Sequence, residues 1–148
     1  MSQRIWFVEA TPAALNELAQ GTLVEALGIT FTEVGPDYIR GRMPVDGRTR
    51  QYLGMLHGGA SVALAETIAS TASNLVVNPQ THYCVGLEIN ANHLRAVRQG
   101  YVWGEARPLH LGRTTHVWDI RLYEEGTNAL VAVIRHTVIV LSRLEKNP

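Results

Sequence analysis

The chain has 148 residues, a formal net charge of zero at neutral pH, and 46% apolar residues. This length fits one domain over 1–148 that can bury a core without disulfide bridges, and the composition is typical of a globular protein. The balanced charge argues against a basic surface for nucleic acid or for an anionic membrane.

The numbers of cysteine, arginine and lysine residues give expectations about disulfides and about ligands. Cys84 is the only cysteine, so no internal disulfide can form, and we expect a small buried side chain rather than a nucleophile. No signal peptide and no membrane-spanning apolar run is found, so we expect the cytoplasm. Arginine outnumbers lysine twelve to one, which either suits the binding of phosphate groups or reflects codon usage.

Two short helices are expected near the N-terminus. Thr11 followed by Pro12 is typical of a helix N-cap with proline in the first turn, and predicts a helix through about Ala19. A second short helix is expected over 22–27.

Two strands follow these helices. The first is expected over 29–34 and ends at the turn residues 35–37. The second is expected over 38–45, where Arg40 and Arg42 alternate with apolar positions. This alternation predicts one buried and one exposed face.

The next element is a long helix, expected from about 59 to 77 and ended by Asn78–Pro79. Glu66 is the only charged residue in 58–77, and the other residues predict a helix buried on almost every side. A carboxylate there loses its hydration, and no basic residue lies three or four positions away. We therefore expect Glu66 to be functional.

Four strand-like stretches in succession complete the chain. They cover 85–92, 100–109, 113–123 and 128–141, with a hairpin turn at Glu125–Gly126. In 113–123 the residues alternate, with Trp118, Ile120 and Leu122 on the face opposite Val117. One long helix between two early strands and a four-strand antiparallel run predicts an α+β fold, with the sheet wrapped about the helix.

A narrow polar stripe marks one face of the long helix. Ser70 and Ser73 follow Glu66 at i+4 and i+7. For Ser73, and for Asn74 beside it, we expect a structural role in helix packing. The six histidines lack the spacing of metal ligands, so no metal site is predicted.

His57 and the pair Gly58–Gly59 stand at the start of the same helix. The glycines let another group approach the backbone N–H donors of the helix N-terminus. His57 itself is open to two interpretations, a satisfied structural residue or a member of the site.

The distance between Gly58 and Glu66 along the helix predicts an oligomer. Gly58 and Glu66 are separated by roughly 12 Å along a helix, whereas a reacting carbon must lie about 3 Å from both groups. Two antiparallel copies of the helix, crossing near a two-fold axis, would bring Gly58 of one subunit to Glu66 of the other. We therefore expect a homodimer with two shared sites.

Taken together, these motifs resemble the hotdog-fold thioesterases, in the branch with a glutamate on the central helix. The most similar members are the bacterial aryl-CoA thioesterases, which include 1,4-dihydroxy-2-naphthoyl-CoA hydrolases and enterobactin-pathway proofreading enzymes. The Glu-type 4-hydroxybenzoyl-CoA thioesterases are more distant. The resemblance covers nearly the whole chain and rests on 43–49, Gln51, 56–61, 65–66, 86–93 and 108–112.

The resemblance implies a hotdog fold and hydrolysis of aryl-CoA or related acyl-CoA thioesters, with carrier-protein thioesters also open. It implies no metal and no cofactor, because coenzyme A is part of the substrate, and a dimer of dimers. Glu66 would be the nucleophile or general base. The Gly58 N–H would polarise the thioester carbonyl, assisted by Gln51, and His57 would lie beside the thioester. Either Ser70 or Thr71 would orient the acyl group or the water.

The resemblance also implies which residues bind the acyl group and coenzyme A. Arg95 and Arg113 are expected to contact its phosphates, with weaker support for Arg98. The implied binding residues are Thr71, Gly86, His93, Leu94, Arg95, Ala96, His110, Leu111, Gly112, Arg113, Thr114 and Thr115.

Two alternatives are weighed against this interpretation. A hotdog hydratase or dehydratase would usually carry an HFP or Asp-x-Asn-Pro-x-His type motif, and neither is present. A non-catalytic acyl-CoA-binding protein would tolerate loss of Glu66 or of the diglycine, and both are present. The physiological acyl group is not determined by the sequence.

Overall fold

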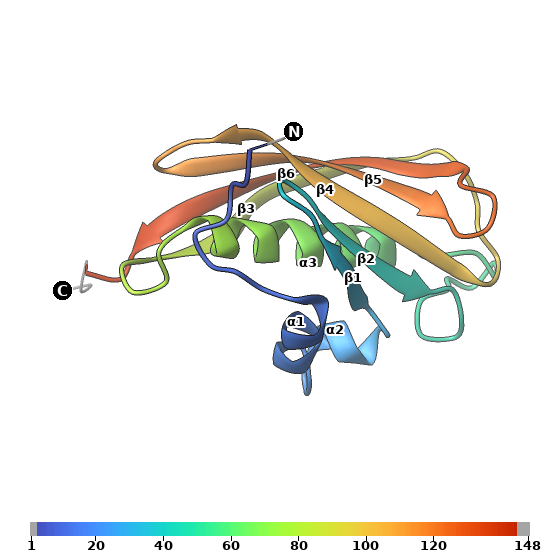
Figure 1. Cartoon of the computed structure of the whole chain (residues 1–148). Helices are drawn as coiled ribbons and strands as arrows, with labels where there is room; N and C mark the ends of the chain where they lie inside the picture. The colour runs from blue at the N-terminus through green and yellow to red at the C-terminus, as the bar shows by residue number, and fades with distance from the viewer. Residues whose placement is uncertain (1–2, 145–148) are drawn as a thin grey trace.

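In the computed structural model, which describes residues 3–144, an antiparallel sheet of six strands curves around one long helix (Figure 1). This is the predicted α+β architecture. Two short helices pack against the first strand and the long helix. The elements are α1 (Pro12–Leu18), α2 (Leu23–Ala26), β1 (Thr30–Val34), β2 (Ile39–Pro44), α3 (Gly58–Val76), β3 (His82–His93), β4 (Tyr101–Leu111), β5 (Thr115–Glu124) and β6 (Leu130–Ser142).

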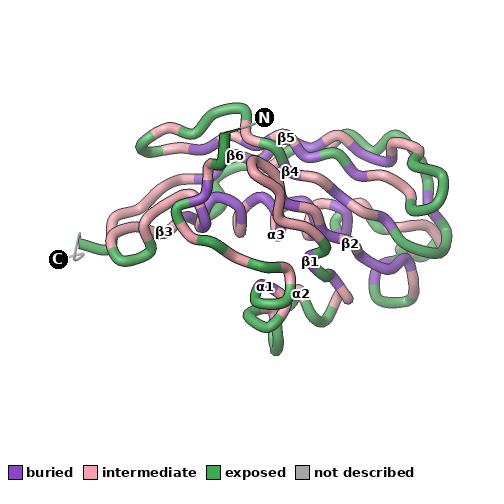
Figure 2. The backbone as a smooth tube through the Cα atoms, in the orientation of Figure 1, coloured by how far each residue is buried: buried purple, intermediate pink, exposed green. Residues whose placement is uncertain are grey.

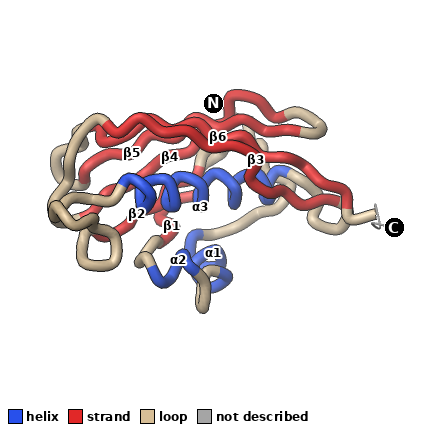
Figure 3. The backbone as a smooth tube through the Cα atoms, turned by 180° about the vertical axis from the view of Figure 1, so that it is seen from behind, coloured by secondary structure: helices blue, strands red, loops and turns tan. Residues whose placement is uncertain are grey.

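The order of strands in the sheet is β1-β2-β4-β5-β6-β3. The sequence groups β3 to β6 as one run, but only β4, β5 and β6 pair in chain order. β3 lies at the far edge beside β6 instead of next to β4 (Figure 3). The two edges of the sheet are therefore the five residues of β1 and the twelve residues of β3.

Threonine side chains cap the starts of the two short helices, and the cap at Thr11 is the predicted one. The Thr11 hydroxyl accepts the Ala14 N–H, and Pro12 occupies the first turn of α1. The side chain of Thr22 caps α2 in the same way, through the Val24 N–H. Each cap satisfies a donor that the helix itself leaves free.

The core lies between α3 and the concave face of the sheet. The predicted alternation is confirmed in β5, where Trp118, Ile120 and Leu122 are fully buried. Gly41 of β2 brings the sheet close to the helix, because a Cβ there would lie 2.8 Å from the Cγ2 atom of Ile68. Shape complementarity at such points fixes how α3 sits on the sheet.

The prediction that α3 is buried on almost every side is wrong for the single chain. Nine of its nineteen residues are buried, and buried and partly buried positions follow one another along the helix (Figure 2). The sheet covers one side of the helix, whereas α1 and α2 cover the other only in part. Consequently the Glu66 side chain is 45% exposed.

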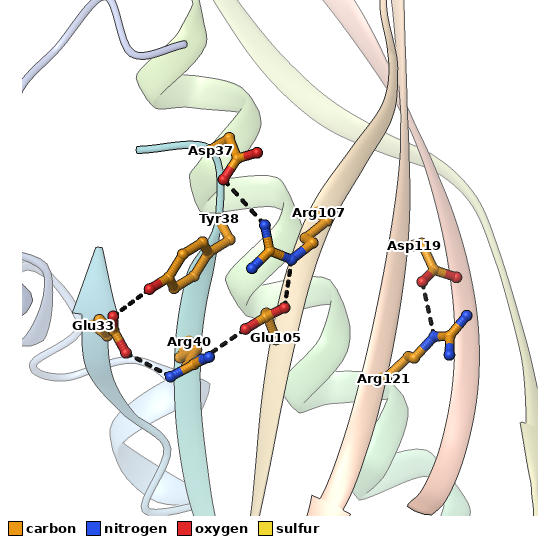
Figure 4. A network of polar contacts seen from close by, with 8 residues as sticks. All are labelled: Glu33, Asp37, Tyr38, Arg40, Glu105, Arg107, Asp119 and Arg121. Carbon is orange, nitrogen blue, oxygen red and sulfur yellow. Dashed lines mark hydrogen bonds and ion pairs between the residues drawn. The ribbon is translucent and has the colours of Figure 1, made fainter. Parts of the chain in front are cut away.

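The face of the sheet turned away from α3 carries a network of ion pairs (Figure 4). Arg40 lies 2.8 Å from Glu33 and 2.7 Å from Glu105. Arg107 lies 2.6 Å from Glu105 and 3.1 Å from Asp37. These partly exposed pairs contribute little stability individually, but each of the charged groups has a partner of opposite charge on this polar face.

None of the helices within residues 3–144 is long and apolar enough to cross a membrane.

Candidate active site

The first part of the site is the N-terminus of α3, which His57 caps. Its Nδ1 atom accepts the Gly59 N–H at 2.8 Å. A ring nitrogen that accepts a hydrogen bond carries no proton, so the neutral ring holds its proton on Nε2 and can donate it. In the described chain the Gly58 N–H has no acceptor. The Gly58 N–H and the Nε2–H of His57 are therefore both free to donate hydrogen bonds at the start of the helix.

A cavity of about 390 Å³ opens at this end of α3, and we call it the glycine cavity. His93 packs on Gly58, because a Cβ at Gly58 would lie 2.9 Å from its Nε2 atom. The cavity brings together six residues that the sequence predicts for the site. Its lining comprises Gln51, Met55, Leu56, Gly58, Ser61, His93, Leu94, Arg95, Ala96 and Val131.

A second cavity, of about 330 Å³, lies along α3, and we call it the glutamate cavity. Apolar side chains from α2 and from the segment between α2 and β1 form one wall, and mostly polar side chains of α3 form the other. It holds three further predicted residues, Glu66, Ser70 and Thr71. Its lining comprises Leu23, Val24, Leu27, Ile29, Ala63, Glu66, Thr67, Ser70 and Thr71.

Glu66 lies against β3 and β6. Gly86 of β3 faces it closely, because any Cβ at that position would collide with the Glu66 Oε1 atom. On β6, the His136 Nε2 atom lies 3.9 Å from Glu66 Oε1 and 2.9 Å from Ser70 Oγ. Within residues 3–144, no Lys or Arg side chain lies within ion-pair distance of Glu66, and His136 is its nearest basic group.

His136 is the residue that the sequence reasoning missed. It occupies an inward position of β6 between Ile134 and Val138, both of which are buried. That position is a signal the sequence does contain, since a histidine in the buried register of an apolar strand must find polar partners.

The two cavities share no lining residue, so one chain does not bring Gly58 and Glu66 together. This agrees with the helix-rise argument, which separates the two groups along the same helix. A single chain thus presents two incomplete parts of a site.

The remaining predicted residues, 110–115, span the end of β4, the turn 112–114 and the first residue of β5, and they line neither cavity. The Val140 N–H donates to the Thr114 carbonyl at 2.9 Å and holds the turn against β6. Arg113 is exposed and has no hydrogen-bond or ion-pair partner in the described chain. Arg95 lies 3.6 Å from Glu124, and Arg98 donates to the Leu53 carbonyl.

Cys84, Asn74 and Ser73, for which we expected structural roles, contact the core or the backbone of the sheet. Burial raises the pKa of the Cys84 thiol to about 11, so the thiol stays protonated and unreactive. Asn74 bonds the backbone N–H and carbonyl of Cys84, and thereby ties α3 to β3. Ser73 bonds the side chains of His116 and Trp118 in the core. Within residues 3–144 no three His, Cys, Asp or Glu side chains gather as metal ligands would.

Comparison with known proteins adds an independent finding. A family model described as the thioesterase superfamily matches residues 53–131. The chain is 50% identical over 121 residues to a proofreading thioesterase of Cronobacter sakazakii, covering 82% of this chain and 88% of that protein. It is 48% identical over 121 residues to the 1,4-dihydroxy-2-naphthoyl-CoA hydrolase of Escherichia coli, with the same coverage.

The fold is also found among solved structures. The crystal structure of a thioesterase from Haemophilus influenzae has a TM-score of 0.93 and 46% sequence identity, and covers 97% of this chain and 99% of that chain.

Proposed function

The chain belongs to the thioesterase superfamily, and we propose on that basis that it hydrolyses acyl-CoA thioesters with aromatic acyl groups. One observation carries the proposal: α3 presents a free N–H at its start and, two turns later, an isolated carboxylate facing an apolar cavity. A thioesterase needs these two groups, a donor for the developing oxyanion and a base or nucleophile.

In this proposal the Gly58 N–H receives the oxygen of the thioester carbonyl. The donor is fixed in place, and the helix dipole adds to its partial positive charge. Gln51 and the Nε2–H of His57 assist at the same carbonyl or at the departing thiolate. Attack at the carbonyl carbon then breaks the carbon–sulfur bond, and coenzyme A leaves as the thiolate.

Glu66 supplies the attack in one of two ways. As a general base it takes a proton from a water that adds to the carbonyl carbon. As a nucleophile it forms an anhydride that water then hydrolyses. Ser70 or Thr71, both in the glutamate cavity, would orient the water or the acyl group. The apolar side chains of α2 suit an aromatic acyl group.

The active unit in this proposal is a homodimer joined along β3. This edge strand is twelve residues long, exposes Val85 and Leu87, and carries Glu88 as its only Asp, Glu, Lys or Arg. Long, nearly uncharged edges of this kind favour pairing with another strand. Two-fold pairing of β3 reverses the direction of the partner's α3, as a site shared between Gly58 and Glu66 requires. A further association into a dimer of dimers remains a prediction.

The phosphates of coenzyme A would be bound by arginine. Arg113 is the stronger candidate, because it is exposed on the β4–β5 turn and unpaired in the described chain. Arg95 would exchange its 3.6 Å ion pair with Glu124 for a phosphate contact. The cytoplasm, where acyl-CoA substrates would be available, stays the expected location.

The test is a thiol-release assay with benzoyl-CoA, hydroxybenzoyl-CoA and 1,4-dihydroxy-2-naphthoyl-CoA. We expect turnover by the wild type and a loss of about 10²-fold or more in Glu66→Gln. Glu17→Gln on the exposed side of α1 is the matched control and should keep its rate. Binding of the thioesters without release of thiol would show an acyl-CoA-binding protein instead. Equal rates for Glu66→Gln and Glu17→Gln would rule out the role of Glu66.

A further inference from the structure

His136 is a buried histidine whose polar atoms all point to α3 or β3. The residue is 0% exposed and lies in the middle of β6. Burial of a polar ring costs free energy unless its nitrogens are hydrogen-bonded. Both nitrogens of His136 have partners, and the Nε2 atom also lies 3.9 Å from Glu66 Oε1.

A bulge in β3 provides the first partner. Gly86 and Glu88 pair with consecutive residues of β6, Val138 and Thr137, so Leu87 is an extra residue in β3. Such bulges redirect the backbone and interrupt the ladder of strand hydrogen bonds. Here the Glu88 carbonyl lies 3.0 Å from the His136 Nδ1 atom.

This contact sets the proton position on the ring. A carbonyl can only accept, so Nδ1 carries the proton and the neutral ring leaves Nε2 as an acceptor. Nε2 lies 2.9 Å from Ser70 Oγ, and the Ser70 hydroxyl therefore donates its proton to His136. The lone pairs of Ser70 Oγ are left free as acceptors at the wall of the glutamate cavity.

We propose that His136 is a positioning residue of the thioesterase site, acting through Ser70 and Glu66. The inference rests on the proposed function, in which Glu66 is the base or nucleophile. By accepting the hydrogen bond of the Ser70 hydroxyl, His136 fixes the direction of that O–H group, so that the lone pairs of Ser70 Oγ accept a proton of the water or hydroxyl next to Glu66. Its ring and the bare backbone of Gly86 also confine the Glu66 carboxylate, since the Nε2 atom is 3.9 Å from Oε1.

The chain contains a matched pair of histidines that separates positioning from packing. His116 on β5 is also buried, at 2% exposure, and its Nδ1 lies 3.0 Å from Ser73 Oγ of the same helix. No carboxylate lies within ion-pair distance of His116 among the described residues, whereas His136 has Glu66. Replacing either residue removes a hydrogen bond between a buried histidine and a serine of α3, but only the replacement of His136 touches the site.

The experiment compares His136→Gln with His116→Gln in the thiol-release assay, at a temperature where both variants are folded by circular dichroism. We expect kcat of His136→Gln to fall about tenfold to a hundredfold with KM within about twofold, because misplaced groups slow the chemical step. His116→Gln should keep kcat within about twofold. Equal kcat losses in the two variants would overturn the proposal.

A second measurement tests the route through Ser70. Because His136 acts through Ser70, the double variant Ser70→Ala/His136→Gln should be no slower than the slower single variant. Multiplied losses would overturn that route. If His136→Gln fails to fold, His136→Asn and His116→Asn are compared in its place: a loss of kcat of about tenfold in His136→Asn alone supports the proposal, and equal kcat values overturn it.

The proposed function fails in a distinguishable way. If Glu66→Gln retains full activity, the role of Glu66 itself is wrong. If Glu66→Gln is inactive while His136→Gln and Ser70→Ala are fully active, only the positioning role of His136 is lost.

Discussion

At the scale of single residues, different atoms at the start of α3 cap the helix and donate hydrogen bonds to a ligand. His57 uses Nδ1 to cap the helix, and this leaves its Nε2–H and the Gly58 N–H free. The same backbone turn thus stabilises the helix and presents donors for an oxyanion. Substitutions of His57 or Gly58 can therefore remove the donors and keep the helix cap, or remove both.

Gly58→Pro removes the proposed oxyanion donor without disturbing the helix. Gly58 is the first helical residue, where proline is well tolerated, and His57 has the extended backbone (φ −69°, ψ 130°) that precedes proline readily. We expect a loss of about 10²–10³ in kcat.

Gly58→Ala is the control for that variant, because it keeps the N–H and adds the same Cβ beside the flexible His93 ring. The two variants are compared by steady-state kinetics. Equal activities would contradict the role of the Gly58 N–H.

His57→Asn and His57→Ala separate the cap from the donor. Asparagine is a strong N-cap, so His57→Asn should keep its stability, whereas His57→Ala should lose about 1 kcal/mol. Both variants lack the Nε2–H and should lose activity to a similar extent. Urea denaturation and the thiol-release assay measure the two effects. Full activity of His57→Asn would show that His57 is a structural cap only.

At the scale of elements, α3 meets the sheet through buried polar pairs as well as apolar contacts. Ser73 bonds His116 and Trp118 of β5, and Asn74 bonds the backbone of β3. Such satisfied groups fix the rotation of the helix on the sheet, since an unpaired partner would cost free energy. They also make the packing sensitive to protonation.

Stability should fall in mild acid because of His116. Burial, and to a smaller extent the nearby His110, lower the pKa of His116 below its ordinary value of 6.5. A hydrogen bond with the backbone of Gly112 opposes this shift. Unfolded chains therefore bind a proton at a higher pH than the folded protein does. His116 thus contributes stability that is complete above about pH 6.5 and is lost as the pH falls toward the folded pKa.

The measurement is the free energy of unfolding in urea at pH 7.5 and 5.5, at one fixed protein concentration. Wild type should lose more stability between these pH values than His116→Gln does. The same loss in both proteins would mean that other groups carry the acid sensitivity.

At the scale of the whole molecule, the single chain is incomplete on two counts. The long β3 edge is unpaired in the described chain, and the two cavities divide the predicted site between them. A two-fold dimer would pair the β3 edge and would also complete the site, because it brings each Gly58 to the partner's α3.

Mixed dimers test the shared site directly. Glu66→Ala and Gly58→Pro subunits, each nearly inactive alone, are unfolded together and refolded as a mixture. With shared sites, every mixed dimer has one intact site and one doubly altered site. Random pairing makes about half of the dimers mixed. Because each mixed dimer has one of its two sites intact, about a quarter of the wild-type activity should return. Sites contained within one chain would recover nothing, and the measured activity would then contradict the shared arrangement.

Much of the fold could be predicted from the sequence because its signals are local. Thr11–Pro12 marks a helix start, alternation places Trp118 inside β5, and the composition around Glu66 sets that carboxylate apart. The thioesterase resemblance, based on short motifs, is confirmed by the family match. The roles of the individual site residues stay predictions.

The sequence by itself determined the helices, the strand faces and the isolated carboxylate, because caps and periodicity act between residues a few positions apart. Only the tertiary structure decided that β3 is an edge, that α3 is half open, and that His136 reaches Ser70 across 66 positions of sequence. The physical reason is that strand order, the bulge at Leu87 and side-chain contacts depend on packing the whole chain, which no local pattern specifies.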